Sequence, residues 1–140
     1  MPTTLSNSDL QVMNLLEAQT GARAKDVVVL GEEIVFVVEK GDLGKAIGKN
    51  GQNILKLRRS LGHDVTVVES AGDIRSFLSN VFKPAKLVEI RESNAPGRKV
   101  ANVVVNAEDK GIAIGKGGSR VKVARVLSQR LFGFDDVKIV

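Results

Sequence analysis

Residues 42–51 read Asp-Leu-Gly-Lys-Ala-Ile-Gly-Lys-Asn-Gly, and residues 109–118 read Asp-Lys-Gly-Ile-Ala-Ile-Gly-Lys-Gly-Gly. The two strings are identical at seven of ten positions and lie 67 residues apart. Arg58 and Arg125, which lie outside the strings, keep the same spacing. Because similarity at a fixed period is the signature of a structural repeat, the sequence indicates two copies of one unit.

The hydrophobic pattern around the strings predicts the same order of elements in both copies. For the first copy we expect a helix over 6–21, strands over 26–30 and 33–39, a short helix over 42–47, a helix over 52–61 and a strand over 65–69. For the second copy we expect a helix over 73–83, strands over 86–91 and 99–106 joined by a longer turn at 93–98, a short helix over 108–114, a helix over 119–132 and a strand over 137–140. The last helix of the second copy is expected to be about one turn longer, since Gly62 and Gly133 are 71 residues apart.

The segment Ser70-Ala71-Gly72 is the best linker candidate between the copies. We therefore expect two domains, residues 1–70 and residues 71–140, each containing one of the glycine-rich strings. Since helices and strands are mixed within each copy, the expected fold class is α+β.

The composition excludes several classes of chemistry. The chain has no Cys and a single histidine, His63, so disulfides, thiolate zinc sites and Cys nucleophiles are excluded, and little remains for a metal site or a His-based triad. We therefore expect a binding protein rather than an enzyme, with no metal and no cofactor. The first ten residues lack the features of a signal peptide and no apolar run reaches membrane-spanning length, so we expect a cytoplasmic protein without a membrane partner.

Positive charge is concentrated in two windows. Residues 43–63 contain five Lys and Arg and no acid, and residues 110–130 contain six Lys and Arg and no acid. Because the whole chain carries a net charge of +5, the remaining residues carry −6. Two basic patches on an acidic body favour a surface for a polyanion, although solvated lysines on exposed helix faces would give the same count.

Each string ends in a turn between two expected helices, Gly48-Lys49-Asn50-Gly51 in the first copy and Gly115-Lys116-Gly117-Gly118 in the second. Glycine accepts positive φ and leaves the backbone without Cβ atoms, so that a sugar–phosphate chain can pack directly on the main chain. The N–H groups at the start of the following helix attract an anion, and the lysine adds a charge at the tip. A tight turn between helices, without any ligand, is the alternative reading.

Two other phosphate-binding motifs do not fit the strings. A Walker A loop has four residues between its glycines and a Ser or Thr after its Lys, whereas each string has three such residues and no hydroxyl at that position. The second string also lacks the final glycine of the dinucleotide fingerprint. We therefore expect no nucleotide cofactor and no small-molecule substrate.

With these loops the chain resembles a tandem pair of type II KH domains, whose three-stranded sheets carry their helices on one face. A KH Gly-x-x-Gly loop grips about four nucleotides of single-stranded nucleic acid. The resemblance implies that both loops bind RNA and that bases lie in grooves walled on one side by strands 65–68 and 137–139. It assigns the helical walls of these grooves to Ile47, Ile54, Ile114 and Val121. Each of these aliphatic side chains would alternatively belong to the core.

Basic side chains in the loops and on the helices after them are expected to contact phosphates. They are Lys49, Lys56, Arg58, Arg59, Lys116, Arg120, Lys122 and Arg125. The chain has five Phe and no Trp or Tyr, and its pattern leaves only Phe132 and Phe134 free to lie outside the core. Since other single-strand binders stack bases on exposed rings, this scarcity favours contact with aliphatic side chains.

Residues 5–140 resemble the KH pair of the NusA family of transcription factors, and most of all its short archaeal members. The resemblance implies a role in transcription termination, antitermination or elongation through single-stranded RNA, the nascent transcript. RNA polymerase and other transcription factors are the implied protein partners. A KH protein associated with the ribosome or with rRNA is the alternative, and single-stranded DNA is also a feasible ligand.

Overall fold

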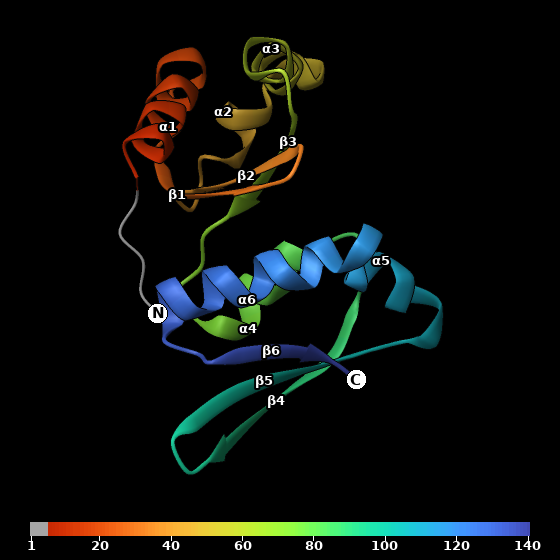
Figure 1. Ribbon diagram of the computed structural model, residues 1–140. Helices are drawn as coiled ribbons and strands as arrows, with labels where there is room; N and C mark the ends of the chain where they lie inside the picture. Colours follow the sequence, from red (N-terminus) through yellow and green to blue (C-terminus); the bar gives the residue numbers. More distant parts are fainter. Residues whose placement is uncertain (1–5) are drawn as a thin grey trace. The chain divides into compact units, whose positions relative to one another are not determined.

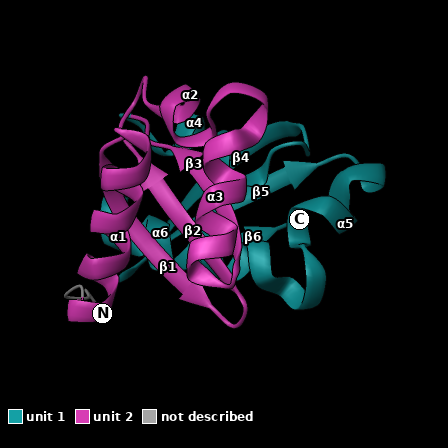
Figure 2. Ribbon diagram, turned by 90° about the horizontal axis from the view of Figure 1, so that it is seen from above, with its two compact units in different colours: residues 1–3, 72–140 teal, residues 4–71 magenta. Residues whose placement is uncertain are grey.

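The computed structural model describes residues 6–140, of which Ala95 is described by its backbone only. The N-terminal residues in which we expect no signal peptide lie partly outside this range. The chain divides between Ala71 and Gly72 into two compact units, which Figure 2 shows in magenta and teal. We call residues 6–71 the N-terminal unit and residues 72–140 the C-terminal unit.

The N-terminal unit contains three helices and three strands, with a single 3-10 turn, Lys49–Gly51, between α2 and α3. They are α1 (Asn7–Thr20), β1 (Ala24–Leu30), β2 (Glu33–Val38), α2 (Leu43–Ile47), α3 (Gln52–Leu61) and β3 (Asp64–Glu69). The sheet order is β1-β2-β3, in which β1 and β2 are antiparallel and β2 and β3 are parallel.

The C-terminal unit repeats this order with 3-10 turns at Ala107–Asp109 and Lys116–Gly118. Its elements are α4 (Ile74–Phe82), β4 (Leu87–Ala95), β5 (Arg98–Val105), α5 (Lys110–Ile114), α6 (Ser119–Phe132) and β6 (Asp136–Ile139). The sheet order β4-β5-β6 has the same strand directions, and the helices of each unit lie on one face of its sheet (Figure 1). The predicted order of elements is confirmed, as is the extra turn, because α6 has 14 residues and α3 has 10.

The ends of α1 and α4 follow from ordinary capping chemistry. The Ser6 side chain accepts from the Asp9 N–H while the Asp9 carboxylate accepts from the Ser6 N–H, and Gly21 ends the helix in the left-handed conformation. Asp73 caps α4 by accepting from the Ser76 N–H. By contrast, α3 and α6 have no side-chain cap at their N-termini, because a left-handed glycine precedes each of them.

The prediction of a longer turn at residues 93–98 is wrong. The strands β4 and β5 continue to a two-residue turn at Pro96-Gly97, across which Ala95 pairs with Arg98. Proline followed by a glycine with φ of 74° is typical of a type II turn. Ser93 and Asn94 favour turns by their chemistry, but on an exposed edge strand they pair with β5 without burying polar groups.

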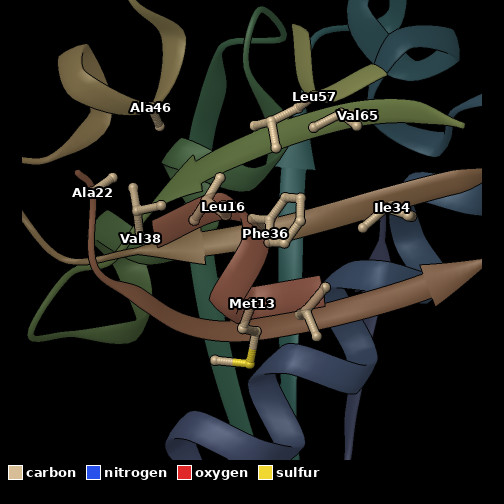
Figure 3. Packing of buried hydrophobic residues seen from close by; sticks show 10 residues of the cluster. Met13, Leu16, Ala22, Ile34, Phe36, Val38, Ala46, Leu57 and Val65 are labelled. Atoms are coloured by element: carbon tan, nitrogen blue, oxygen red, sulfur yellow. The ribbon is translucent and has the colours of Figure 1, made fainter. Parts of the chain in front are cut away.

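The core of the N-terminal unit lies between its helices and its sheet, with Phe36 among Leu16, Leu57 and Val65 (Figure 3). Two fully buried residues, Ala46 and Leu57, fix the helices on either side of the first glycine loop. Their counterparts 67 residues later, Ala113 and Ala124, are equally buried. The loops therefore connect helices that are anchored in the core in both units.

The expectation that Phe132 and Phe134 lie outside the core is wrong. Phe134 is only 3% exposed and carries the Lys99 ammonium 4.5 Å from its ring centroid, a cation–π contact. The half-buried Phe132 ring lies 5.4 Å from that of Phe77. All five phenylalanines are thus buried or half-buried, which leaves no exposed ring on which a base could stack.

Candidate nucleic-acid interface

The two glycine loops, residues 48–51 and 115–118, have one backbone geometry. Their first, third and fourth residues all have positive φ, with values of 78°, 57° and 74° in the first loop and 78°, 63° and 78° in the second. Among the described residues, Asn50 is the only non-glycine residue with positive φ. Asparagine tolerates this conformation better than most residues, which explains how it replaces the third-position glycine. The sequence repeat is therefore also a repeat of backbone conformation.

Glycine is required at the first loop position for a second reason, because a Cβ atom there would clash with neighbouring atoms. A Cβ atom on Gly48 would lie 2.7 Å from Cγ of Asn53, and one on Gly115 would lie 2.9 Å from the backbone nitrogen of Arg120. Asn53 is itself held, because its amide nitrogen Nδ2 donates to the Lys45 carbonyl at 2.7 Å. The first turn of the helix after each loop thus packs directly against the loop backbone.

Both loops present backbone donors that the protein does not use. The Gly48 N–H donates to the Gly44 carbonyl and the Gly51 N–H to the Gly48 carbonyl. Within residues 6–140, however, no hydrogen bond uses the N–H of Lys49 or Asn50, nor the N–H of Lys116 or Gly117. Adjacent free N–H groups in a positive-φ turn form a concavity that binds anions, so each loop can receive a phosphate oxygen.

The predicted phosphate-contacting cations divide into two groups. Five of them are exposed and, among the described residues, form no ion pair or side-chain hydrogen bond: Lys49, Lys56, Arg59, Lys116 and Lys122. The other three bind the protein itself. Arg58 Nη2 donates to the Val65 carbonyl at 3.3 Å, and Arg120 Nη1 donates to the Val81 and Lys83 carbonyls at 3.0 and 2.8 Å. Arg125 forms an ion pair with Asp136.

Only part of the basic pattern recurs in both units. Lys49 and Arg58 have basic counterparts 67 residues later, in Lys116 and Arg125. The counterpart of Lys56 is Val123, which is 3% exposed, and that of Arg59 is Val126. The outer face of α3 is therefore basic, whereas the matching face of α6 is apolar.

The predicted groove residues differ in how accessible they are. Ile47 and Ile114, at the ends of α2 and α5, are 36% and 40% exposed. Ile54 and Val121 are half-buried, and Ile54 packs against the core. Of the strand residues expected to face them, Val65 and Val137 are buried in the core, while Val67 and Ile139 are half-buried. Ile47 and Ile114 are therefore the most accessible of the predicted groove residues.

Sequence reasoning missed Leu55, a 48% exposed residue of α3. It lies four residues after Gly51, so both residues lie on the same face of the helix. The signal was present in the sequence, because Leu55 breaks the polar pattern expected of an exposed helical position. His63 lies in the turn before β3, with Nδ1 2.8 Å from the Leu61 carbonyl oxygen. It lines an open hollow with Glu32, Arg58, Arg59, Gly62 and Asp64.

Asp136, at the start of β6, neutralises part of the basic surface of the C-terminal unit. Its Oδ1 accepts from Arg125 Nε at 2.6 Å and from the Val137 N–H at 2.8 Å, and its Oδ2 accepts from Arg98 Nη2 at 2.9 Å. Burial alone would raise the pKa of Asp136, but these hydrogen bonds and the two guanidinium charges outweigh burial and hold the pKa below its ordinary value. The folded state therefore favours the ionised carboxylate.

We expect Asp136→Asn to lower the free energy of unfolding by about 1 kcal/mol at pH 7, in the range of a partly exposed ion pair. A carboxylate with a lowered folded-state pKa stabilises the fold above its unfolded pKa of about 4, and the stabilisation is lost as the pH falls through the folded-state pKa. The difference between wild type and variant should consequently shrink as the pH falls below about 4. Thermal unfolding followed by circular dichroism at several pH values measures it, and an equal difference at pH 7 and pH 2 would contradict the assignment.

The described residues contain no cluster of three or more His, Cys, Asp or Glu side chains that could hold a metal ion. Nor does any helix within residues 6–140 combine the length and hydropathy needed to cross a bilayer.

Comparison with known proteins places this geometry in a family. The KH domain family model matches residues 12–72 and again residues 73–140. The chain is 34% identical to a probable transcription termination protein NusA of Halobacterium salinarum, over 99% of both chains. It is 31% identical to the protein of the same name from Methanococcus vannielii, over 100% of this chain and 81% of the relative.

A solved structure agrees with the sequence comparisons. The crystal structure of APE1850 superimposes with a TM-score of 0.85 at 34% identity, covering 96% of this chain and 99% of that one. Both KH matches contain one of the glycine loops, and the relatives match along almost the whole chain. The chain therefore belongs to the KH-domain proteins and, among them, to the archaeal NusA-like family.

Proposed function

We propose that this protein binds single-stranded RNA through both glycine loops, each of which receives the sugar–phosphate backbone on its free N–H groups. The observation that carries the proposal is the recurrence of two unused N–H groups beside one unpaired lysine in each loop. A chance turn between helices would not need a lysine at the same place twice. Ile47 and Ile114 then contact the bases next to the bound phosphates.

We further propose that the RNA is a nascent transcript and that binding affects termination, antitermination or elongation. The archaeal relatives are named as probable transcription termination proteins, and their alignments cover 99% and 100% of this chain. Two loops in one chain can hold two segments of one RNA, so that the second contact forms at high effective concentration. Co-purification with transcription complexes rather than with ribosomal subunits would distinguish this role from that of a KH protein associated with the ribosome or with rRNA.

The proposal predicts a strong dependence of affinity on salt. Neutralising one phosphate of a single strand contributes about −0.7 to the slope of log affinity against log salt. The five unpaired cations named above would therefore give a slope of about −3.5 for an RNA long enough to reach both loops. Fluorescence anisotropy with a labelled single-stranded RNA between about 50 and 300 mM salt measures the slope.

Two controls accompany the titration. A DNA oligomer of the same sequence shows whether the 2′-hydroxyl contributes, and an ATP and GTP hydrolysis assay should give no turnover. A slope near zero would contradict binding through these cations. Sequencing of RNA crosslinked to the protein in cells would separate a transcript ligand from an rRNA ligand.

A further inference from the structure

The face of α3 that continues from the first loop can be defined by helix geometry. Gly51, Ile54, Leu55 and Arg58 are spaced i, i+3, i+4 and i+7, so they lie on one face. This face turns toward β3, because Arg58 donates to the Val65 carbonyl. We call these four residues the first groove face.

The same construction gives a second groove face on α6, composed of Gly118, Val121, Lys122 and Arg125. It turns toward β6, because Arg125 binds Asp136 there. The two faces match at three positions, with glycine, an aliphatic residue and arginine in the same places. They differ in chemical class at one position, where the first has Leu55 and the second has Lys122.

The side chains at this position are accessible to solvent in both units. Leu55 is 48% exposed, and Lys122 is exposed and unpaired among the described residues. The arginines differ in the opposite sense, since Arg125 is neutralised by Asp136 while Arg58, whose partner is an uncharged carbonyl, keeps its positive charge. A ligand next to the aliphatic residue and glycine therefore meets exposed apolar surface at Leu55 on the first face, and an unpaired ammonium at Lys122 on the second.

The net charges of the two halves agree with the same division. Residues 72–140 contain 13 Lys and Arg against 7 Asp and Glu, a net charge of +6. Residues 1–71 contain 8 against 9, a net charge of −1. All of the excess positive charge of the protein thus belongs to the half with Lys122, and long-range attraction of a polyanion comes from that half.

We propose that the two units bind RNA in different ways, with Leu55 and Lys122 as the residues that determine the difference. The C-terminal unit captures the backbone through charge, with little regard to the bases. The N-terminal unit depends on apolar contact between Leu55 and an unstacked base, and so supplies most of the dependence on base identity. This inference rests on the proposed binding of RNA by both loops.

The test exchanges the two side chains in the full chain, as Leu55→Lys and Lys122→Leu. Each has a matched control on the strand edge opposite its groove face. Val29→Lys on β1 is the control for Leu55→Lys, because Val29 is 47% exposed. Lys86→Leu, at the exposed residue before β4, is the control for Lys122→Leu. The probes are a single-stranded oligouridylate and an abasic ribose–phosphate oligomer of the same length.

We expect Lys122→Leu to weaken binding of both probes about five- to tenfold at low salt and to reduce the salt slope by about 0.7. We expect Leu55→Lys to increase the slope by a similar amount and to reduce the preference for oligouridylate over the abasic oligomer by at least threefold. The control variants should change neither quantity by as much as half of these effects.

Different outcomes overturn different statements. If the wild-type protein binds neither probe, the proposed function fails. If it binds oligouridylate but the exchanged variants behave like their controls, or if Lys122→Leu alters base preference more than Leu55→Lys does, the division of roles between the units is wrong. Circular dichroism of every variant verifies that the fold is retained.

Discussion

Replacing Lys49-Asn50 and Lys116-Gly117 by Asp pairs is expected to reduce affinity for single-stranded RNA by more than 100-fold while leaving the circular dichroism spectrum unchanged. Four carboxylates would stand beside the N–H groups that are proposed to bind phosphate, so that each loop repels the backbone it should hold. The fold should persist, because these four residues are exposed and Asp tolerates the positive φ of the third loop position. Anisotropy titrations at constant salt give the affinity.

A charge-matched variant separates the effect of the loops from that of net charge. The quadruple replacement changes the net charge by −6, as does the triple variant Lys25→Asp, Lys40→Asp and Lys86→Asp. These three lysines are exposed and lie outside both loops. We expect the triple variant to bind less than tenfold more weakly than wild type. Comparable losses in both variants would mean that the loops have no special role.

The loops could be predicted from sequence because their information is local. Glycine at the first and last positions is required by the dihedral angles and the close packing of residues within five positions of each other. The helices beside the loops are similarly fixed by an apolar pattern with the period of a helix. Each of these features can be read from a window of about a dozen residues.

The contacts that could not be predicted join residues that are far apart in the sequence. The sequence does not predict that Arg120 donates to carbonyls at the end of α4, 37 and 39 residues earlier in the sequence. Those carbonyls need partners because a helix leaves its last C=O groups unpaired. The prediction that Phe134 lies outside the core is wrong for a similar reason, since its contact with Lys99 joins residues 35 positions apart. No local pattern marks either pair.

The contact of Arg120 with α4 affects which basic residues after the second loop are available to bind phosphate. Arg120 Nη1 is committed to two carbonyls within the protein, and withdrawing the guanidinium to reach a phosphate would leave those carbonyls without these partners. Lys116 and Lys122 have no such commitment among the described residues. Contact of Arg120 with phosphate stays a prediction, whereas its observed role is to join the start of α6 to the end of α4.

That junction makes Gly115 the loop residue at which substitution should be most damaging. Gly115→Ala is expected to lower the free energy of unfolding by about 3 kcal/mol or more. The backbone at φ 78° and ψ 170° belongs almost only to glycine, and such strain costs about 1–3 kcal/mol. In addition, the new Cβ would lie 2.9 Å from the Arg120 backbone nitrogen, which cannot move without displacing the first turn of α6.

Gly118→Ala is the matched control within the same loop. Gly118 also has a φ of 78°, but no atom lies within 4 Å of the position that a Cβ atom would take there. Its cost should therefore be only the left-handed backbone, about 1–2 kcal/mol. Since the chain has no Trp or Tyr, urea unfolding is followed by circular dichroism, with hydrogen exchange to assign the loss to the C-terminal unit. Equal destabilisation by the two substitutions would show that the start of α6 shifts to accommodate the added methyl group. The close packing of the loop against α6 would then not explain why residue 115 is glycine.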